Sequence, residues 1–523
     1  MQTNTTDILT MDDFLGEMLR SVLPADAIPA DRPLALLADV AAPPSTELAP
    51  QDARRLRDRA RAQHLLRLLG LLLCNLDYAE RDEGGALDDS ADRQVYFVDK
   101  KTFADVLARL NELVTLQLNE VFHQPELREL EATWRSVSDL VDRTNFAANI
   151  GLSLIDATKA EIGDDMAANG ADIAASELFK KVYTAEYDQL GGEPYAALVG
   201  LYEIENTYDD RALLKGMASL CKASHAPFVA AASPRLFGVE DMRQLMEVRD
   251  VSASLDEAWM ALRELEEFAY IGLTLPRYVV RRPYRATDSA GGLVRFREEP
   301  PSPDHEPLRY VWGNAAMLFA RNLVRSFEGS GWCQYIRGVK GGGYLEGLAR
   351  VALDGADDEL RPPVEVVIPD YGELGLANAG FIPLVYKKGS VDAVFFSSQA
   401  MKRPSIGADP HISENSQLTT NLAYTFSISR IAHYLKRMMR DNVGSSADAN
   451  YVKGQIDAWI SRYVTTIVNP DDLTLRYYPF KAYALRVAPV DGRIGWYDCN
   501  LTIQPHIQFE GMDVTLRVDA RLG

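Results

Sequence analysis

The stretch YAALVGLYEIENTYDDRALLKGMASLCKASHAPFVAAAS, residues 195–233, decides the fold class. Two short apolar runs, 195–204 and 226–233, stand on either side of a helical stretch over 208–223. Continuous apolar runs of this length are typical of strands that are buried on both faces of a sheet. A strand, a helix and a second strand in succession predict an α/β unit.

The same alternation continues toward residue 400 and predicts a larger core. Further apolar runs that suit buried strands are 149–157, 270–280, 363–370, 381–387 and 392–399. The helical stretches between them are 175–188, 240–249, 256–269 and 312–328. We therefore expect an α/β core with mixed sheets over residues 148–400.

The residues before this core carry proline-rich and helical sequence. Residues 1–50 combine a short amphipathic piece with a proline-rich stretch, which predicts an arm or linker. Residues 51–147 predict a helical region whose last part holds two helices divided near Pro125. The second helix has one apolar face with three- and four-residue steps. That face consists of Leu127, Leu130, Trp134, Val137 and Val141.

Residues 401–523 predict a C-terminal domain made of helices followed by β structure. A long helix is expected over about 413–442, and a further helix around Trp459. Asp491-Gly492 marks a hairpin turn in the β segments that follow. The fold class predicted for the whole chain is thus α/β with mixed α+β character, with a helical region before the core and an antiparallel β segment after it.

Composition limits the possible partners and compartments. The chain has 75 acidic and 55 basic side chains, a net charge of −20, which disfavours binding to nucleic acid or to anionic membranes. Four cysteines stand singly, so neither a zinc site nor a disulfide framework is expected, and a reducing compartment fits. The start of the chain does not resemble a secretory signal, and the apolar patch at 64–74 is too short to span a membrane.

The stretch IRGVKGGGYLEGLAR, residues 336–350, is the most enzyme-like part of the sequence. Lys340 precedes the glycines and no Ser or Thr follows, so the stretch fails the phosphate-loop pattern, and its spacing fails the dinucleotide pattern. The sequence favours a structural turn and leaves phosphate binding as the alternative. The glycines of this turn are Gly338, Gly341, Gly342, Gly343 and Gly347.

No other pattern in the sequence indicates catalysis. The histidines are far apart, no serine-hydrolase elbow is present, and the paired acids suit solvated faces or turns. We therefore expect no catalytic residue, no cofactor and no metal site.

Two segments remain as candidates for binding other chains. Residues 10–23 predict a short amphipathic helix, which either docks on its own domain or is presented to a groove in another protein. The end of the chain alternates strictly between apolar and polar residues, which predicts a half-buried strand. This strand pairs either within its own sheet or, by β-augmentation, with a neighbouring chain. Its apolar residues are Met512, Val514, Leu516 and Val518.

Several segments in chain order, spread over about residues 110–523, resemble one family. They are LRELEATWRSVSDLVDRTNF, SELFKKVYTAEYDQLGGEPYAALVGLYEI, HAPFVAAASPRLFG, YIGLTLPR, YVWGNAAMLFA, GWCQYIRGVKGGGYLEGL, GFIPLV and SRIAHYLKRMMRDNVGS. Together they are similar to the large subunit of the contractile sheath of bacterial type VI secretion systems, the TssC/VipB family. In that family the glycine run occurs in a near-identical form.

The resemblance implies a structural, non-enzymatic role in the bacterial cytoplasm. Such subunits pair with a small sheath subunit (TssB/VipA), polymerise helically around an inner tube of Hcp, and start from a baseplate. Contraction expels the tube, and the AAA+ unfoldase ClpV then dismantles the sheath. The family's N-terminal motif for the unfoldase resembles Met11 to Leu15 here, so the implied handle lies in the amphipathic helix. The candidate handle residues are Asp12, Asp13, Phe14, Leu15, Met18 and Leu19.

Two other functions remain open on the sequence alone. One is a sheath of another contractile injection device, such as a phage-tail-like particle. The other is an α/β enzyme that binds a nucleotide through residues 338–347.

Overall fold

The computed structural model describes residues 100–170, 172–248, 250–285, 296–299, 310–353, 356–405, 410–467, 470–492 and 496–506. The chain forms two compact units, one of residues 1–128 with 283–309 and the other of residues 129–282 with 310–523. Among the described residues, no helix has both the length and the apolar character that crossing a membrane requires.

In the first unit, the end of helix α4 (Lys100–Phe122) packs against residues from 284–299. The ring of Phe122 stacks on Phe296 with centroids 5.3 Å apart, and Tyr284 lies beside both rings. The side-chain oxygen of Asn119 accepts a hydrogen bond from the backbone N–H of Glu299 at 3.1 Å. These contacts hold a distant segment of the sequence against the helix.

The second unit is built on a six-stranded mixed sheet with the order β1-β2-β3-β9-β10-β6. The first four strands in this order are parallel, and the last two are antiparallel to their neighbours. The strands are β1 (Leu198–Ile204), β2 (Phe228–Ala232), β3 (Ile271–Leu275), β9 (Ile382–Tyr386), β10 (Ala393–Phe395) and β6 (Tyr344–Leu345). The predicted α/β class with mixed sheets is therefore confirmed.

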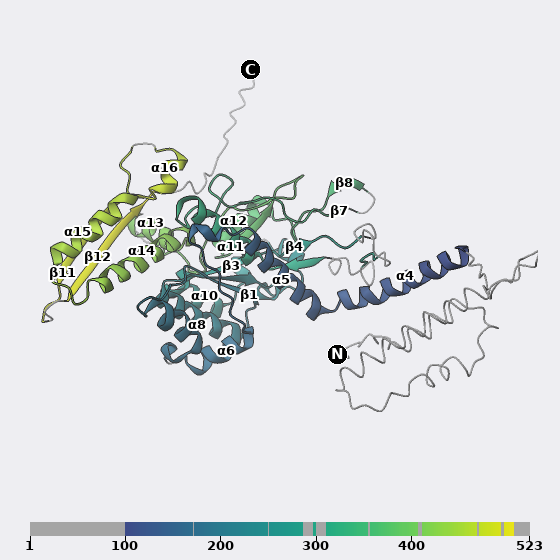
Figure 1. The fold of residues 1–523 in the computed structure, drawn as a ribbon, viewed down its shortest axis with the longest axis horizontal. Coiled ribbons are helices and arrows are strands. Elements are labelled where there is room, and N and C mark those ends of the chain that lie inside the picture. Colours follow the sequence, from purple (N-terminus) through teal and green to yellow (C-terminus); the bar gives the residue numbers. More distant parts are fainter. Residues whose placement is uncertain are drawn as a thin grey trace, which may run out of the picture. The chain divides into compact units, whose positions relative to one another are not determined.

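Helices cover both faces of this sheet, which explains why its strands are apolar throughout (Figure 1). Phe228 and Ala230 of β2 pack with α8 (Tyr208–Ser224), whereas Val229 between them packs on the opposite face with α11 (Ala315–Ser330). Helix α8 starts where the Thr207 side chain caps the Asp210 N–H. With both faces covered, each strand reads as a continuous apolar run rather than as an alternating one.

Further elements of the second unit surround the sheet. The α-helices are α5 (Pro125–Asp142, which starts in the first unit), α6 (Lys159–Ala168), α7 (Glu177–Phe179), α9 (Met242–Leu245), α10 (Glu257–Arg263) and α12 (Asp370–Asn378), and a π-helix spans Lys180–Tyr187. Two small antiparallel pairs are β4 (Tyr278–Arg281) with β5 (Val311–Gly313) and β7 (Ala352–Leu353) with β8 (Ala356–Leu360). Short 3-10 turns lie at Phe146–Ala148, Ile173–Ala175, Pro234–Phe237, Ser252–Ser254, Glu266–Tyr270 and Ser461–Tyr463.

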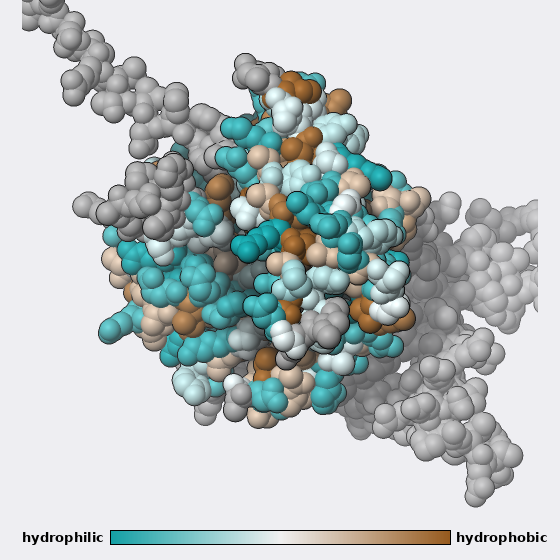
Figure 2. Space-filling model, turned by 90° about the vertical axis from the view of Figure 1, so that its left-hand side faces the viewer, coloured by the Kyte–Doolittle hydropathy of each residue, from teal (hydrophilic) through white to brown (hydrophobic). Residues whose placement is uncertain are grey.

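The C-terminal part carries a hairpin on a helix. After α13 (Pro410–Thr419) and α14 (Leu422–Asp441), α15 (Ala449–Ile460) packs on β11 (Phe480–Pro489), which pairs with β12 (Tyr497–Pro505). The helix α16 (Asp472–Tyr477) precedes the hairpin. The predicted turn residues Asp491 and Gly492 lie in the hairpin loop, with φ of 77° at Gly492. On the side that carries this hairpin, apolar residues reach the surface in several separate places among polar ones (Figure 2).

Three expectations about single elements are wrong. Residues 150–158 form neither strand nor helix, and their apolar side chains Leu154 and Ile155 are exposed, because no neighbouring strand among the described residues pairs with them. Residues 363–369 form only an isolated bridge between Val364 and Tyr278. The helix expected over 413–442 is two helices, because the Asn421 side chain caps a new start by accepting from the Ala423 N–H.

Helix α5 leaves most of its predicted apolar face exposed. The buried residues of α5 are Ala132, Ser136 and Leu140. The hydroxyl of Tyr278 donates to Ser136 Oγ at 3.0 Å, and the guanidinium of Arg281 pairs with Glu131. Polar partners in β4 thus select the small and polar face of the helix for burial. Of the predicted apolar face, Val137 still packs against the core beside Leu140, whereas Leu130, Trp134 and Val141 are exposed.

Candidate functional site

Charged residues gather where the parallel strands end. Glu203 lies near the end of β1 and Glu205 just beyond it, Arg235 follows β2, and Arg277 follows β3. Because these strands are parallel, their carboxyl ends meet at one edge of the sheet, the position where open α/β sheets place their ligands. This edge is therefore the candidate site.

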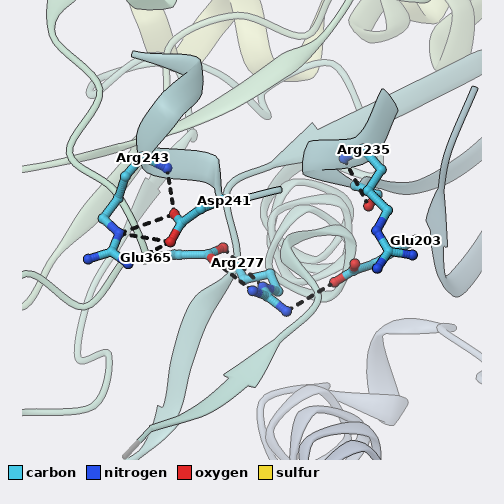
Figure 3. Close-up of polar contacts among 7 residues, drawn as sticks. Glu203, Arg235, Asp241, Arg243, Arg277 and Glu365 are labelled. Carbon is cyan, nitrogen blue, oxygen red and sulfur yellow. Dashed lines mark hydrogen bonds and ion pairs between the residues drawn. The ribbon is translucent and has the colours of Figure 1, made fainter. Parts of the chain in front are cut away.

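Arg277 is the centre of an ionic network at this edge (Figure 3). Its Nε and Nη2 atoms donate to the two carboxylate oxygens of Glu365 at 2.9 Å and 2.6 Å. Its Nη1 atom lies 3.7 Å from Glu203 Oε1. Beside this pair, Asp241 receives the guanidinium of Arg243, with Nη2 and Oδ2 2.5 Å apart. The network joins residues that are up to 162 positions apart in sequence, from Glu203 to Glu365.

The electrostatics of the network fix the positive charge of Arg277 and disfavour the negative charge of Glu203. Burial by itself lowers the pKa of Arg277, but Glu365, Glu203 and Asp241 together raise it above the usual value. Burial raises the pKa of Glu203; Arg277 opposes the rise, and the neighbouring carboxylates Glu365, Glu129 and Glu205 add to it. A guanidinium that is held permanently charged by carboxylates orients the chain and is a poor proton donor, so this arrangement is suited to structure rather than to acid–base chemistry.

A half-open pocket of about 320 Å³ adjoins the network. Its lining includes Glu129, Glu203 and Glu205, together with Lys159 and the rings of Tyr202 and Trp312. The amine of Lys159 already has partners, since it lies 2.9 Å from Asp210 Oδ1 and donates to the backbone oxygen of Glu203 at 3.0 Å. The pocket therefore presents a surplus of negative charge.

The glycine turn is tightly packed. A Cβ on Gly343 would lie 2.3 Å from the carbonyl oxygen of Phe395, and one on Gly342 would lie 2.1 Å from that of Tyr335. Gly338 and Gly347 both have a φ of 68°, which favours glycine without any crowding. Gly341 is crowded by the carbonyl oxygen of Arg337 at 2.4 Å. Gly338, Gly341, Gly342 and Gly343 thus lie in one turn before β6, and Gly347 follows β6; each of the five has a conformational or steric reason to be glycine.

The polar groups of this turn bond mainly to the protein itself. The Gly338 N–H donates to Phe395 O at 2.7 Å, and the Gly343 N–H donates to Gly338 O at 2.8 Å. The guanidinium of Arg476 donates to Lys340 O at 3.0 Å, and that of Arg325 donates to Gly342 O. A phosphate loop needs free amides and nearby cations, whereas here two amides bond internally and two arginines bond to carbonyl oxygens.

Two histidines that are far apart in sequence meet at helix α14. The rings of His225 and His433 are 6.4 Å apart, and Tyr187 lies beside both. His433 Nε2 lies 2.9 Å from the carbonyl oxygen of Ser224, so this nitrogen is the one that carries the proton. Burial lowers the pKa of His433 to about 4. Within the part of the chain that is described, no three His, Cys, Asp or Glu side chains are placed to hold a metal ion.

The other predicted site residues lie outside the described residues. These are the candidate handle Asp12, Asp13, Phe14, Leu15, Met18 and Leu19 and the terminal-strand residues Met512, Val514, Leu516 and Val518. Conversely, the structure contains two features that the sequence analysis did not predict, namely the ionic network around Arg277 and the adjoining pocket. A usable signal was present, because Arg235 and Arg277 each follow closely on a fully apolar strand.

Comparison with known proteins gives the family. The family model described as "EvpB/VC_A0108, tail sheath N-terminal domain" (VipB) matches residues 104–402. A second one, "EvpB/VC_A0108, tail sheath gpW/gp25-like domain" (VipB_2), matches residues 411–522. The "Type VI secretion system sheath protein TssC1" of Pseudomonas aeruginosa PAO1 is 34% identical over 430 residues, which cover 81% of this chain and 86% of that protein.

Two solved structures match more distantly. The anti-feeding prophage baseplate has a TM-score of 0.35 at 12% identity and covers 71% of this chain and 84% of the matched chain. The contracted helical sheath of the same particle has a TM-score of 0.32 at 12% identity, with 59% and 67% covered. These TM-scores are too low to carry an argument. The two family matches and the TssC1 relative suffice: the chain belongs to the VipB family of tail sheath proteins, the family of the large type VI secretion sheath subunit TssC.

Proposed function

We propose that this chain is the large structural subunit of a contractile type VI secretion sheath. The observation that carries the proposal is the 34% identity to TssC1 over 81% of the chain, with two sheath domains matched in order. In this role the chain pairs with a small TssB/VipA-like subunit and polymerises helically around an Hcp-like tube from a baseplate. Contraction then expels the tube.

Physical considerations support an assembly of this kind. A subunit that meets its copies through two different surfaces builds an open helix when the rotation between copies does not close a ring. Contraction needs no bound nucleotide if the contracted packing buries more apolar surface than the extended packing does. The chain then needs no catalytic residue, and its place of assembly is the bacterial cytoplasm.

Two further parts of the proposal rest on the sequence alone. Residues Asp12 to Leu19 act as the handle by which a ClpV-like unfoldase extracts subunits from the contracted sheath. The terminal strand with Val514 and Leu516 adds to a sheet of a neighbouring chain, which links subunits through backbone hydrogen bonds while their bodies move.

The test is co-expression with a TssB/VipA-like small sheath subunit, followed by negative-stain electron microscopy. We expect ribbed tubes or stacked rings. Monodisperse globular particles that bind ATP would overturn the proposal in favour of an enzyme.

A further inference from the structure

Helix α5 exposes a stripe of large apolar side chains. Leu130, Trp134 and Val141 are 54%, 58% and 40% exposed, and they share one face of the helix. The opposite face is fixed against β4 by the contacts of Ser136 and Glu131, so the helix cannot turn the stripe inward without breaking them. Tryptophan is the residue type most enriched among the anchors of protein–protein interfaces.

The acidic pocket borders this stripe. Glu129, Thr133 and Ser136 of α5 line the pocket, and at about 100° per residue Thr133 lies between the pocket face and the stripe. On its other side the pocket is bordered by the end of 150–158, where Tyr202 donates its hydroxyl hydrogen to Ala157 O at 2.5 Å. That segment also exposes apolar residues, namely Leu152, Leu154 and Ile155.

The charge of the pocket indicates what it can accept. Three carboxylates line it, of which Glu203 and Glu205 each lie 3.7 Å from an arginine, Arg277 and Arg235. The amine of its lysine is paired with Asp210, so the lining still carries more acid than base. A volume of about 320 Å³ is at the small end of ligand pockets and suits a single long side chain. The rings of Tyr202 and Trp312 line it as well, and aromatic rings attract cations. An amine or a guanidinium on an apolar stem therefore fits it best.

We propose that α5 and the adjoining pocket receive one amphipathic helix of another protein chain in the sheath. Its apolar face covers Leu130, Trp134 and Val141, and one of its lysine or arginine side chains enters the pocket between Glu129, Glu203 and Glu205. The occupant is identified by charge complementarity, since an apolar stripe beside an acidic pocket matches an apolar face flanked by a base. The inference rests on the proposed function and adds a docking surface to it.

The first test measures binding of the co-expressed small sheath subunit to variants of the full chain. Trp134→Glu should weaken binding at least about 30-fold, as expected for a central anchor. The double variant Glu129→Gln with Glu205→Gln should weaken it about tenfold at low salt and less at high salt, because salt screens exposed charges. The matched control Val443→Glu, at a side chain 81% exposed, should bind as the wild type does.

The second test identifies the occupant. A photo-crosslinking residue at position 134 in assembled tubes should form an adduct with a segment of another protein that has apolar residues at helical spacing and a lysine or arginine beside them. An adduct with a second copy of this chain, with its own residues or with nothing would overturn the inference. So would unchanged binding of Trp134→Glu.

The two proposals fail in different ways. If the wild type forms tubes but neither variant binds more weakly, the docking surface is wrong and the sheath function stands. If the wild type forms no tubes with its small partner, the sheath function fails and the docking surface fails with it.

Discussion

Arg277 and Glu365 face each other in a pair of parallel hydrogen bonds, 2.9 Å from Nε to Oε2 and 2.6 Å from Nη2 to Oε1. The backbone N–H of Glu365 also donates to the carbonyl oxygen of Arg277 at 2.9 Å. Residues 363–369 form no helix or strand, and these three bonds tie the segment to the chain after β3, together with the bond from the Val279 N–H to Pro363 O at 2.8 Å.

Glu365→Gln should destabilise the fold by about 2 kcal/mol, because it leaves the half-buried guanidinium of Arg277 with only the more distant carboxylates of Glu203 and Asp241. The measurement is urea unfolding of the purified chain, followed by circular dichroism. The control is Glu240→Gln, whose side chain is 83% exposed and lies 3.7 Å from Arg235. Such an exposed pair should be worth less than about 1 kcal/mol. Equal losses from the two variants would contradict the structural role of the pair.

Gly343→Ala should cost at least about 3 kcal/mol or prevent folding, because the new methyl group would meet the backbone of Phe395, Arg337 and Gly338 within 2.6 Å. The matched control is Gly375→Ala in helix α12, where nothing lies within 4 Å of the added Cβ. There the substitution should stabilise the fold by up to about 1 kcal/mol, because alanine has a higher helix propensity than glycine. Thermal unfolding of both variants tests this. A soluble Gly343→Ala protein of wild-type stability would contradict the packing of the turn.

His433 should make the fold more stable at neutral pH than in acid. Its pKa of about 4 lies below the usual 6.5, so between these values the unfolded chain binds a proton that the folded chain does not. The free energy of unfolding should therefore rise by roughly 3 kcal/mol from this group as the pH increases from 4 to 6.5, and then level off.

The check compares unfolding midpoints at pH 4.5 and 7.5 for the wild type and for His433→Gln, whose amide can still donate to Ser224 O. The variant should lose much of the acid sensitivity. If both proteins lose stability equally in acid, the burial of a neutral His433 is not the cause.

Val514→Asp combined with Leu516→Asp should abolish tube assembly while the chain stays folded, because charges on the apolar face prevent the terminal strand from packing in a neighbour's sheet. Thr515→Asp, on the polar face of the same strand, serves as the control and should assemble. Electron microscopy of co-expressed sheaths gives the readout. Normal full-length tubes from the double variant would show that the strand is dispensable.

Much of the central fold could be predicted because its strands are buried on both faces. Such strands are continuous apolar runs, and β1, β2, β3, β9 and β10 all lie within predicted runs. The rule that a continuous apolar run forms a buried strand failed for residues 149–157. An apolar run forms a strand only where a neighbouring strand is in place to pair with it, and the local sequence does not contain that information. Helix α5 shows the same limit, since partners from β4 decide which of its faces is buried.

The charged edge of the sheet and its pocket could not be predicted from the sequence, for a different reason. Glu203, Arg277 and Glu365 come from three distant parts of the sequence and are joined only by the parallel order of the strands. The position of Arg277 just after an apolar strand is a local signal, but nothing in the local sequence marks Glu203 and Glu365 as its partners. The glycine turn was within reach because its five glycines are close in sequence and their spacing could be compared with known loops.

Helix α14 belongs to two cores at once. Leu422, Ala423 and Phe426 at its start are buried against the central sheet, where the missing side chain of Gly272 makes room for Leu422. One and two turns further on, Ile431 and Leu435 pack with Phe480 of the hairpin. The helix is thus a rigid strut between the sheet and the hairpin. A force applied to the hairpin would therefore be transmitted through α14 to the core of the central sheet, because side chains of this helix are buried at both places.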